Sequence, residues 1–200
     1  MASVVGTRRR SPTRSVLHSS LCLALVSLFA GCSSDVPAAN DGTASREGRS
    51  SPVAAGLDGT SPPPWPAPTD VPERVAAAGL DLGPMGMAEH YHPQLEVIIN
   101  GDEVLVPANI GVDPATGAMS ALHTHTTDGQ IHVEADVVGE VFTLGQLFNE
   151  WGVKLGSDQI GGERAKAGDA VTVTSNGEPY TGEPAELRLE PNQQIVVQLD

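Results

Sequence analysis

The chain has 200 residues, of which 40% are hydrophobic and 4% aromatic, and its formal net charge is −14 at pH 7. A chain this acidic does not bind nucleic acid through its general field, but it attracts cations. Its length fits one modest domain with flanking segments, and we find no internal repeat of the kind that builds solenoids.

Residues 1–31 have the pattern of a signal peptide. Four arginines between positions 8 and 14 precede an apolar run from Val16 to Ala30, which is too short and wrongly flanked for a stable transmembrane helix. The stretch Leu28-Phe29-Ala30-Gly31-Cys32 resembles the lipobox of bacterial lipoproteins, in which the cysteine is lipidated and becomes the N-terminus. An ordinary secretory signal with a chance cysteine is the alternative.

Cleavage before Cys32 has two consequences for the mature chain. Cys22 would be removed and Cys32 lipidated, so no free thiol or disulfide would remain. The mature charge would be 7 − 25 = −18, because four of the 11 basic residues and none of the 25 acidic ones precede Cys32. We expect a lipoprotein anchored to the cell membrane at Cys32 and facing the extracytoplasmic space.

Residues 32–70 are rich in Ser, Pro, Ala, Gly and Asp, a composition typical of a disordered or partly polyproline tether. Trp65 is the one large apolar residue in this segment, and the sequence leaves open whether it packs on the domain. Residues 71–200 are expected to form a single globular domain.

The first predicted elements are a short alanine-rich helix and a β-hairpin. The helix is expected between Val71 and Leu80. Apolar residues then alternate from Leu95 to Ile99 and again from Val104 to Val106, on either side of the turn sequence Asn100-Gly101.

The clearest helix lies between Thr143 and Gly152. Thr143 and Gln146 have the spacing of a capping box, and Gly152 suits the stop. One stripe of the helix carries apolar residues that predict a core face: Leu144, Leu147, Phe148 and Trp151.

Strands are predicted at 170–174 and 194–199, with a turn at Asn176-Gly177 and a possible short strand at Leu187 and Leu189. Together these elements predict an α+β domain in which one small, mostly antiparallel sheet packs on one amphipathic helix. A β-grasp-like arrangement is our first expectation, and a small β-sandwich or cupredoxin-like barrel is the alternative.

The segment 121–135 carries three of the six histidines. If Asp128-Gly129 is a two-residue type I′ turn, His125 pairs with His132 and His123 with Glu134, and these four side chains share one face. The opposite face is apolar and is expected to meet the core: Leu122, Ile131, Val133 and Ala135.

His90 and His92 precede the first hairpin and have the parity of its outer face. If both hairpins lie in one sheet, all five histidines of the mature chain share its outer side. Imidazole groups in this number suit copper or zinc, and the absence of a mature thiol argues against a blue-copper centre. Met85 and Met87 lie just upstream and could add soft ligands for Cu(I). The competing interpretation is a solvated hairpin face whose histidines bind nothing.

Three segments carry a resemblance to a family of proteins. They are His90-Tyr-His92-Pro-Gln-Leu-Glu-Val, Leu122-His-Thr-His-Thr-Thr-Asp-Gly-Gln-Ile-His132-Val-Glu and Phe142-Thr-Leu-Gly-Gln-Leu-Phe-Asn-Glu-Trp151-Gly. In this order they are similar to an uncharacterised secreted or lipoprotein family of high-GC Gram-positive and related bacteria, with the motifs HxH, LHTHDxSGVIHIE and FTLGQFFxxWG. The resemblance implies a secreted domain over residues 75–200 and no particular activity.

The sequence therefore predicts a lipid-anchored, extracytoplasmic domain that handles or senses copper or zinc. His123, His125 and His132 are the first candidate ligands, followed by His90 and His92. Glu134 is expected to be a ligand or to orient an imidazole by accepting its N–H. Two alternatives are an envelope module that binds a protein or polymer, with incidental histidines, and a hydrolase in which three histidines hold a metal that activates water.

Overall fold

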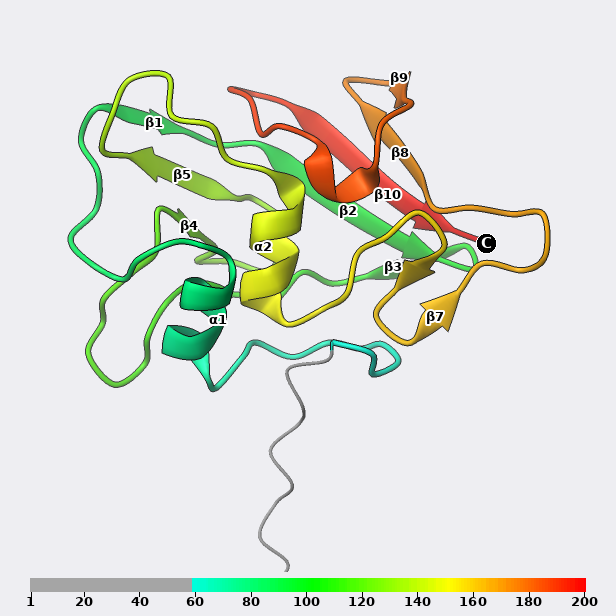
Figure 1. The fold of residues 1–200 in the computed structure, drawn as a ribbon, viewed down its shortest axis with the longest axis horizontal. Helices are drawn as coiled ribbons and strands as arrows, with labels where there is room; N and C mark the ends of the chain where they lie inside the picture. Colours follow the sequence, from blue (N-terminus) through cyan, green and yellow to red (C-terminus); the bar gives the residue numbers. More distant parts are fainter. Residues whose placement is uncertain (1–58) are drawn as a thin grey trace, which may run out of the picture. The chain divides into compact units, whose positions relative to one another are not determined.

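The computed structural model describes residues 59–200 (Figure 1). The predicted signal peptide, the predicted lipidation site at Cys32 and the predicted tether as far as residue 58 lie outside the described residues. Among residues 59–200, no helix is long and apolar enough to cross a membrane.

The main sheet has five strands in the order β3-β2-β10-β8-β9. Strands β2 and β10 run parallel along their whole length, and all other neighbours are antiparallel. The inward side chains of β2 and β10 alternate with more exposed ones, as the sequence pattern predicts. The five strands are β2 (Gln94–Ile99), β3 (Asp102–Val104), β8 (Thr172–Ser175), β9 (Glu178–Tyr180) and β10 (Gln194–Leu199).

Two turns join neighbouring strands of this sheet where the sequence predicted them. Asn100 and Gly101 have φ angles of 52° and 85°, and Asn176 and Gly177 have φ angles of 54° and 81°. Positive φ at both central residues is the requirement of a type I′ turn, which Asn-Gly satisfies at low cost. The short strand predicted at Leu187 and Leu189 is reduced to a single antiparallel bridge between Arg188 and Thr143, just after the 3-10 turn η1 (Pro184–Glu186), and both leucine side chains are buried.

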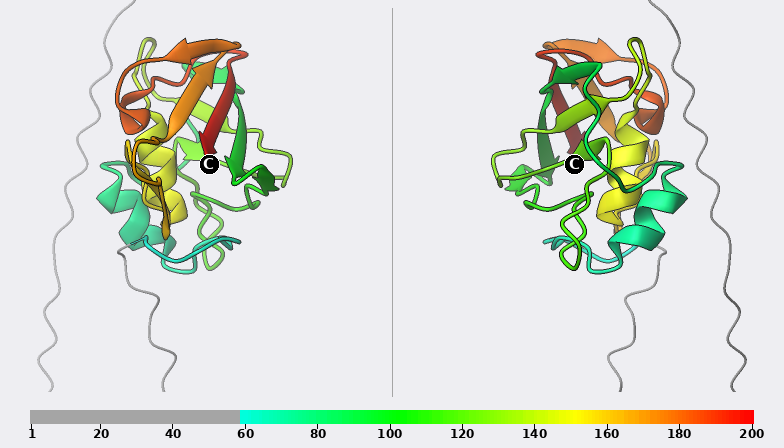
Figure 2. Two further views of the ribbon diagram at one scale, coloured as in Figure 1. Left: turned by 90° about the vertical axis from the view of Figure 1, so that its right-hand side faces the viewer. Right: turned by 90° about the vertical axis from the view of Figure 1, so that its left-hand side faces the viewer.

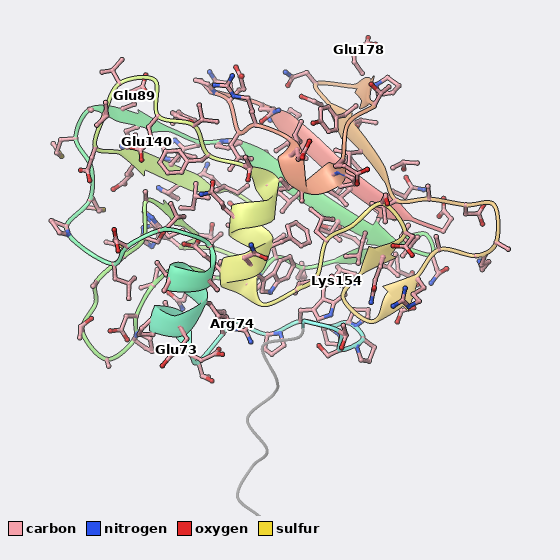
Figure 3. All side chains as sticks on the ribbon, viewed as in Figure 1. Glu73, Arg74, Glu89, Glu140, Lys154 and Glu178 are labelled. Carbon is pink, nitrogen blue, oxygen red and sulfur yellow. The ribbon has the colours of Figure 1, made fainter. Side chains whose placement is uncertain are left out.

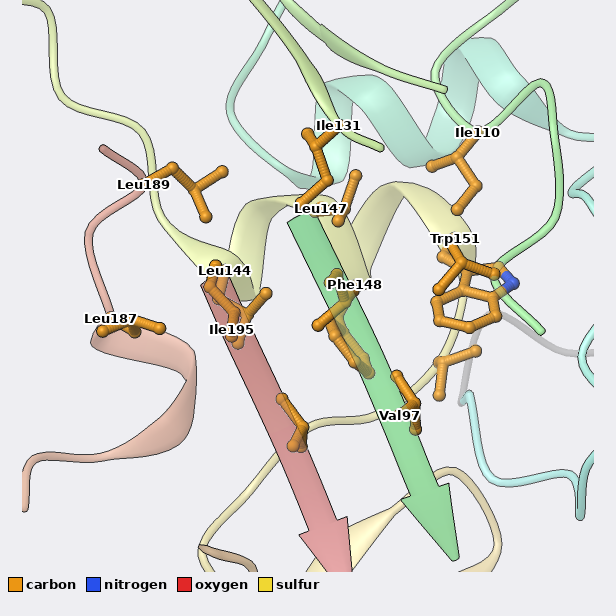
Figure 4. Packing of buried hydrophobic residues seen from close by; sticks show 14 of the residues in the cluster. Val97, Ile110, Ile131, Leu144, Leu147, Phe148, Trp151, Leu187, Leu189 and Ile195 are labelled. Carbon is orange, nitrogen blue, oxygen red and sulfur yellow. The ribbon is translucent and has the colours of Figure 1, made fainter. Parts of the chain in front are cut away.

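Helix α2 (Leu144–Trp151) crosses this sheet and supplies much of the core (Figure 4). Thr143 and Gln146 form the predicted capping box, and Gly152 ends the helix in the left-handed conformation. The predicted stripe is buried against Val97 of β2 and Ile195 of β10. Helix α1 (Val71–Ala77) packs beside α2, on the same side of the strands (Figure 2).

The hairpin β2-β3, the helix α2 and the parallel placement of β10 beside β2 make a β-grasp-like α+β fold. The predicted fold class is confirmed, and no closed barrel forms within residues 59–200.

The sequence predicted one sheet, whereas the strands are divided among three. The histidines lie on a separate sheet of order β1-β5-β4, in which β1 precedes the first hairpin and β4 and β5 lie between that hairpin and α2. A two-stranded ribbon, β6-β7, follows α2. The bounds of these strands are β1 (Glu89–Tyr91), β4 (Leu122–His123), β5 (His132–Ala135), β6 (Gln159–Ile160) and β7 (Glu163–Arg164).

Residues 59–70, which the sequence analysis assigned to the tether, pack on the domain. Trp65 is 3% exposed, and its ring meets that of Trp151 edge to face with centroids 5.7 Å apart. Arg74, which is labelled in Figure 3, is also buried. It binds Asp70 at 2.7 Å and covers Gly152. The packed domain therefore begins before residue 71, because one aromatic side chain in a polar segment buries a large apolar area.

Candidate metal centre

The five histidines of the described chain meet on one face of the β1-β5-β4 sheet. His90 on β1 lies opposite Glu134 on β5, and His123 on β4 lies opposite His132 on β5. Residues directly opposite each other in a strand pair share a face, and so do residues two apart on one strand. His92 and His125 follow the ends of β1 and β4 and turn toward the same centre. The expected shared face is therefore present.

The predicted strand register is wrong by two positions. His123, not His125, pairs with His132, and Glu134 pairs with His90 instead of His123. A shift of one residue would have turned the histidines to the opposite face, but a shift of two preserves the alternation. Leu122, Ile131, Val133 and Ala135 are accordingly all fully buried, as predicted.

The shift arises because backbone groups of residues 124–131 form hydrogen bonds with other segments and not across a hairpin with each other. The Thr124 amide donates to the carbonyl of Ile110 over 3.1 Å, and the Ile131 amide donates to that of Pro93 over 2.9 Å. The Leu95 amide donates to the carbonyl oxygen of Gly129, a residue with a φ of 80°, over 2.9 Å. A hairpin with a two-residue turn at Asp128-Gly129 would break these hydrogen bonds to distant segments.

The histidines form two groups of three that share His132. His90, His92 and His132 make the outer group, and His123, His125 and His132 make the inner group. Within each group, one potential ligand nitrogen per residue lies within 4.8 Å of the others. Ring centroids lie 4.4 Å apart for His92 and His132 and 4.7 Å apart for both His123–His125 and His125–His132.

The ring of His123 is held in a single orientation. The residue is 0% exposed, and its Nδ1 lies 2.9 Å from the carbonyl oxygen of Ser120. A carbonyl can only accept, so Nδ1 carries the proton and Nε2 keeps its lone pair. Among residues 59–200, nothing forms a hydrogen bond to this buried Nε2. Metal-ligating histidines commonly have their second ring nitrogen bonded to a carbonyl in this way.

Two of the imidazoles are kept neutral by their surroundings. Burial lowers the pKa of His123 to about 4, a shift that the Ser120 carbonyl partly opposes and the neighbouring imidazoles reinforce. The pKa of His132 is also lowered to about 4, mainly by burial and further by His123, His92 and His125. Glu134 acts in the opposite direction and raises it. Neutral imidazole is the form that binds a metal, so both rings are ready to ligate at neutral pH.

The shared face is less solvated than a surface hairpin would be. Glu134 is 6% exposed, and its Oε1 lies 3.3 Å from Nε2 of His90, whose side chain is 52% exposed. Such a carboxylate can accept the imidazole N–H and orient the ring, which is one of the two roles expected for Glu134. Met85 and Met87, the other candidate copper ligands, are 44% and 92% exposed on the surface upstream of β1.

Two residues of this region were not singled out from the sequence. Ser120 contributes its backbone carbonyl to His123, which no sequence pattern reveals. Glu150 of α2 is buried, and burial raises the pKa of its carboxyl to about 8 despite the nearby Ser120 hydroxyl. Neither Glu150 oxygen has a well-formed hydrogen bond in the described part of the chain. Its position three residues after Leu147 was a signal that it borders the core face.

Comparison with known protein families, with curated proteins and with solved structures finds no match to this chain. The functional argument therefore rests on the geometry of the histidine groups.

Proposed function

We propose that this protein is a lipid-anchored, extracytoplasmic metal-binding domain that handles or senses copper or zinc through its histidines. The observation that carries the proposal is the buried Nε2 of His123, which lacks a hydrogen-bond partner within residues 59–200 and belongs to a group with His125 and His132. Leaving a buried polar atom unsatisfied costs about 1–3 kcal/mol. A metal ion bound by the group would satisfy this atom.

The donor set favours copper or zinc over magnesium or calcium. Neutral imidazoles suit zinc and copper, whereas magnesium and calcium prefer oxygen ligands. Nitrogens bound to a tetrahedral zinc ion at about 2.0–2.1 Å lie roughly 3.3 Å from each other. Nε2 of His92 and Nδ1 of His132 are already 3.2 Å apart, and rotation of side chains would bring the remaining donors from within 4.8 Å to that spacing.

Titration of the apoprotein with Zn(II), Cu(II) and Cu(I) tests metal binding. We expect a sharp equivalence point at an integral number of ions, and a loss of affinity in His123→Ala and in His132→Ala. Changes that only disturb the surroundings of a ligand cost about 10–100-fold in affinity, so loss of a ligand should cost at least that much. Thr127→Ala, in the same loop and exposed, is the matched control and should bind as the wild type does.

Diffuse, weak binding that is the same in the wild type and in both histidine variants would remove the metal-binding proposal. The affinities can be compared only if the variants are folded. A cooperative thermal unfolding transition of each apoprotein establishes that they are.

Membrane attachment is tested separately at the two cysteines. We expect Cys32→Ser to abolish incorporation of a labelled fatty acid and to move the protein from the membrane to the soluble fraction. Cys22→Ser, within the segment that would be removed, should keep the label. Labelling that survives Cys32→Ser would contradict the proposed anchor.

A further inference from the structure

His132 is the only residue that the outer and inner histidine groups have in common, among the residues that the structure describes. It occupies the middle strand, β5, with His90 on the neighbouring β1 and His123 on β4. Its ring centroid lies 4.4–5.9 Å from those of the other four histidines. The central strand therefore places the imidazole of His132 between two pairs of histidines, His90 with His92 and His123 with His125.

A single ion does not explain this arrangement well. His90 and His92 form one pair, and His123 and His125 form the other. Within residues 59–200, each group of mutually close donors consists of one of these pairs and His132, and no group combines residues of both pairs. Five donors around one ion would all have to lie roughly 3 Å from their neighbours at ordinary metal–nitrogen distances. The donors instead define two centres, one on each side of His132.

An imidazole ring has two nitrogens that point in different directions, and each has a lone pair when it is deprotonated. Nδ1 of His132 lies 3.2 Å from Nε2 of His92, so one nitrogen of the ring is directed to the outer group. The other nitrogen is then available to the inner group.

The geometry points to a two-ion centre in which His132 bridges the ions, an inference that rests on the proposed metal-binding function. Nδ1 of His132 would bind the outer ion with His90 and His92, and Nε2 would bind the inner ion with His123 and His125. The first ion uses a lone pair of neutral His132. Binding of the second forms one metal–nitrogen bond as the remaining N–H bond breaks, and that proton passes to solvent, so His132 becomes an imidazolate.

The local charges suit two cations. The bridging imidazolate and the Glu134 carboxylate would each supply one negative charge, and the chain as a whole carries −14. The two positions also differ in access: His90 of the outer group has a side chain that is 52% exposed, whereas His123 of the inner group is 0% exposed. The outer ion should exchange with solvent more readily than the inner ion.

Cu(II) titration followed by low-temperature electron paramagnetic resonance tests the bridge. We expect two Cu(II) ions per chain, with an integrated signal well below two spins because the imidazolate couples the two centres magnetically. The double variant His90→Ala, His92→Ala should bind one Cu(II) with the full signal of one spin. His125→Ala, on the inner side, should lose the coupled signal and keep the outer ion.

A wild-type protein that binds one Cu(II) would overturn the two-ion centre and leave the proposed metal-binding function standing. Two ions whose signal equals two independent spins would overturn the bridge. A protein that binds no ion tightly would instead remove the proposed function, so the two failures are distinguishable.

Discussion

The imidazole of His123 donates its Nδ1–H to the carbonyl oxygen of Ser120 over 2.9 Å. This bond selects the tautomer of a fully buried ring and leaves its Nε2 as an acceptor. The ring therefore already has the orientation and tautomer of a metal ligand, and the proposed ion would need little rearrangement of His123.

The stability of the apoprotein should have a maximum near pH 6.5. The folded-state pKa values of His123 and His132 are lowered from 6.5 to about 4, so the unfolded chain binds more protons between these values and stability falls as the pH falls from 6.5 to 4. Glu150 has a folded-state pKa raised from 4.5 to about 8, so stability falls as the pH rises toward 8. Chemical denaturation with a chelator present, from pH 4 to 9, measures the curve, and stability that rises steadily from pH 6.5 to 8 would contradict it.

Glu150→Gln should flatten the alkaline side of that curve. Keeping a carboxyl protonated in the folded state costs about 1.4 kcal/mol for each pH unit above its unfolded pKa, until the folded pKa is reached. The variant should match the wild type near pH 4.5 and exceed it in free energy of unfolding by about 1–3 kcal/mol at pH 7, allowing for the unsatisfied amide. A variant that is less stable than the wild type at pH 8 would show that the ionised carboxylate has a partner.

Metal binding through His123 and His132 should resist acid. Both rings stay neutral until the pH approaches their lowered pKa of about 4, so protons compete with a first bound ion for these two ligands only near and below that pH. An ordinary surface histidine would begin to lose its metal near pH 6.5. Zn(II) retention measured by equilibrium dialysis from pH 7 to 4 distinguishes the two, and complete release by pH 6 would be the contrary result.

Trp65→Ala should destabilise the domain strongly. Trp65 is 3% exposed and packs on Trp151, and truncating a buried tryptophan costs about 3–5 kcal/mol. Thr69→Ala, an exposed residue of the same segment, is the control. Equal free energies of unfolding for Trp65→Ala and the wild type would show that residues 59–70 do not contribute to the packed domain.

Thr143→Ala should cost about 1 kcal/mol of stability without changing metal affinity. The variant removes the side chain that accepts the Gln146 amide in the capping box of α2. Urea denaturation and metal titration of the same sample separate the two effects. A large loss of metal affinity would mean that the start of α2 and the histidine face are coupled.

Local sequence signals determined much of the main fold. The two Asn-Gly turns, the capping box at Thr143, the alternation in β2 and β10 and the apolar stripe of α2 all appear where the pattern predicted them. These signals depend on backbone geometry and on helical or strand periodicity within short segments, so they can be read without knowledge of distant contacts.

The sequence by itself also determined which residues share the histidine face, because strand alternation survives a shift of two positions. Only the tertiary structure decided the register, since Ile110 and Pro93 compete for the backbone groups of residues 124–131. It likewise decided that Trp65 is buried, that Ser120 fixes the tautomer of His123, and that His132 stands between two pairs. Each of these depends on contacts between segments far apart in the chain, and no local pattern encodes them.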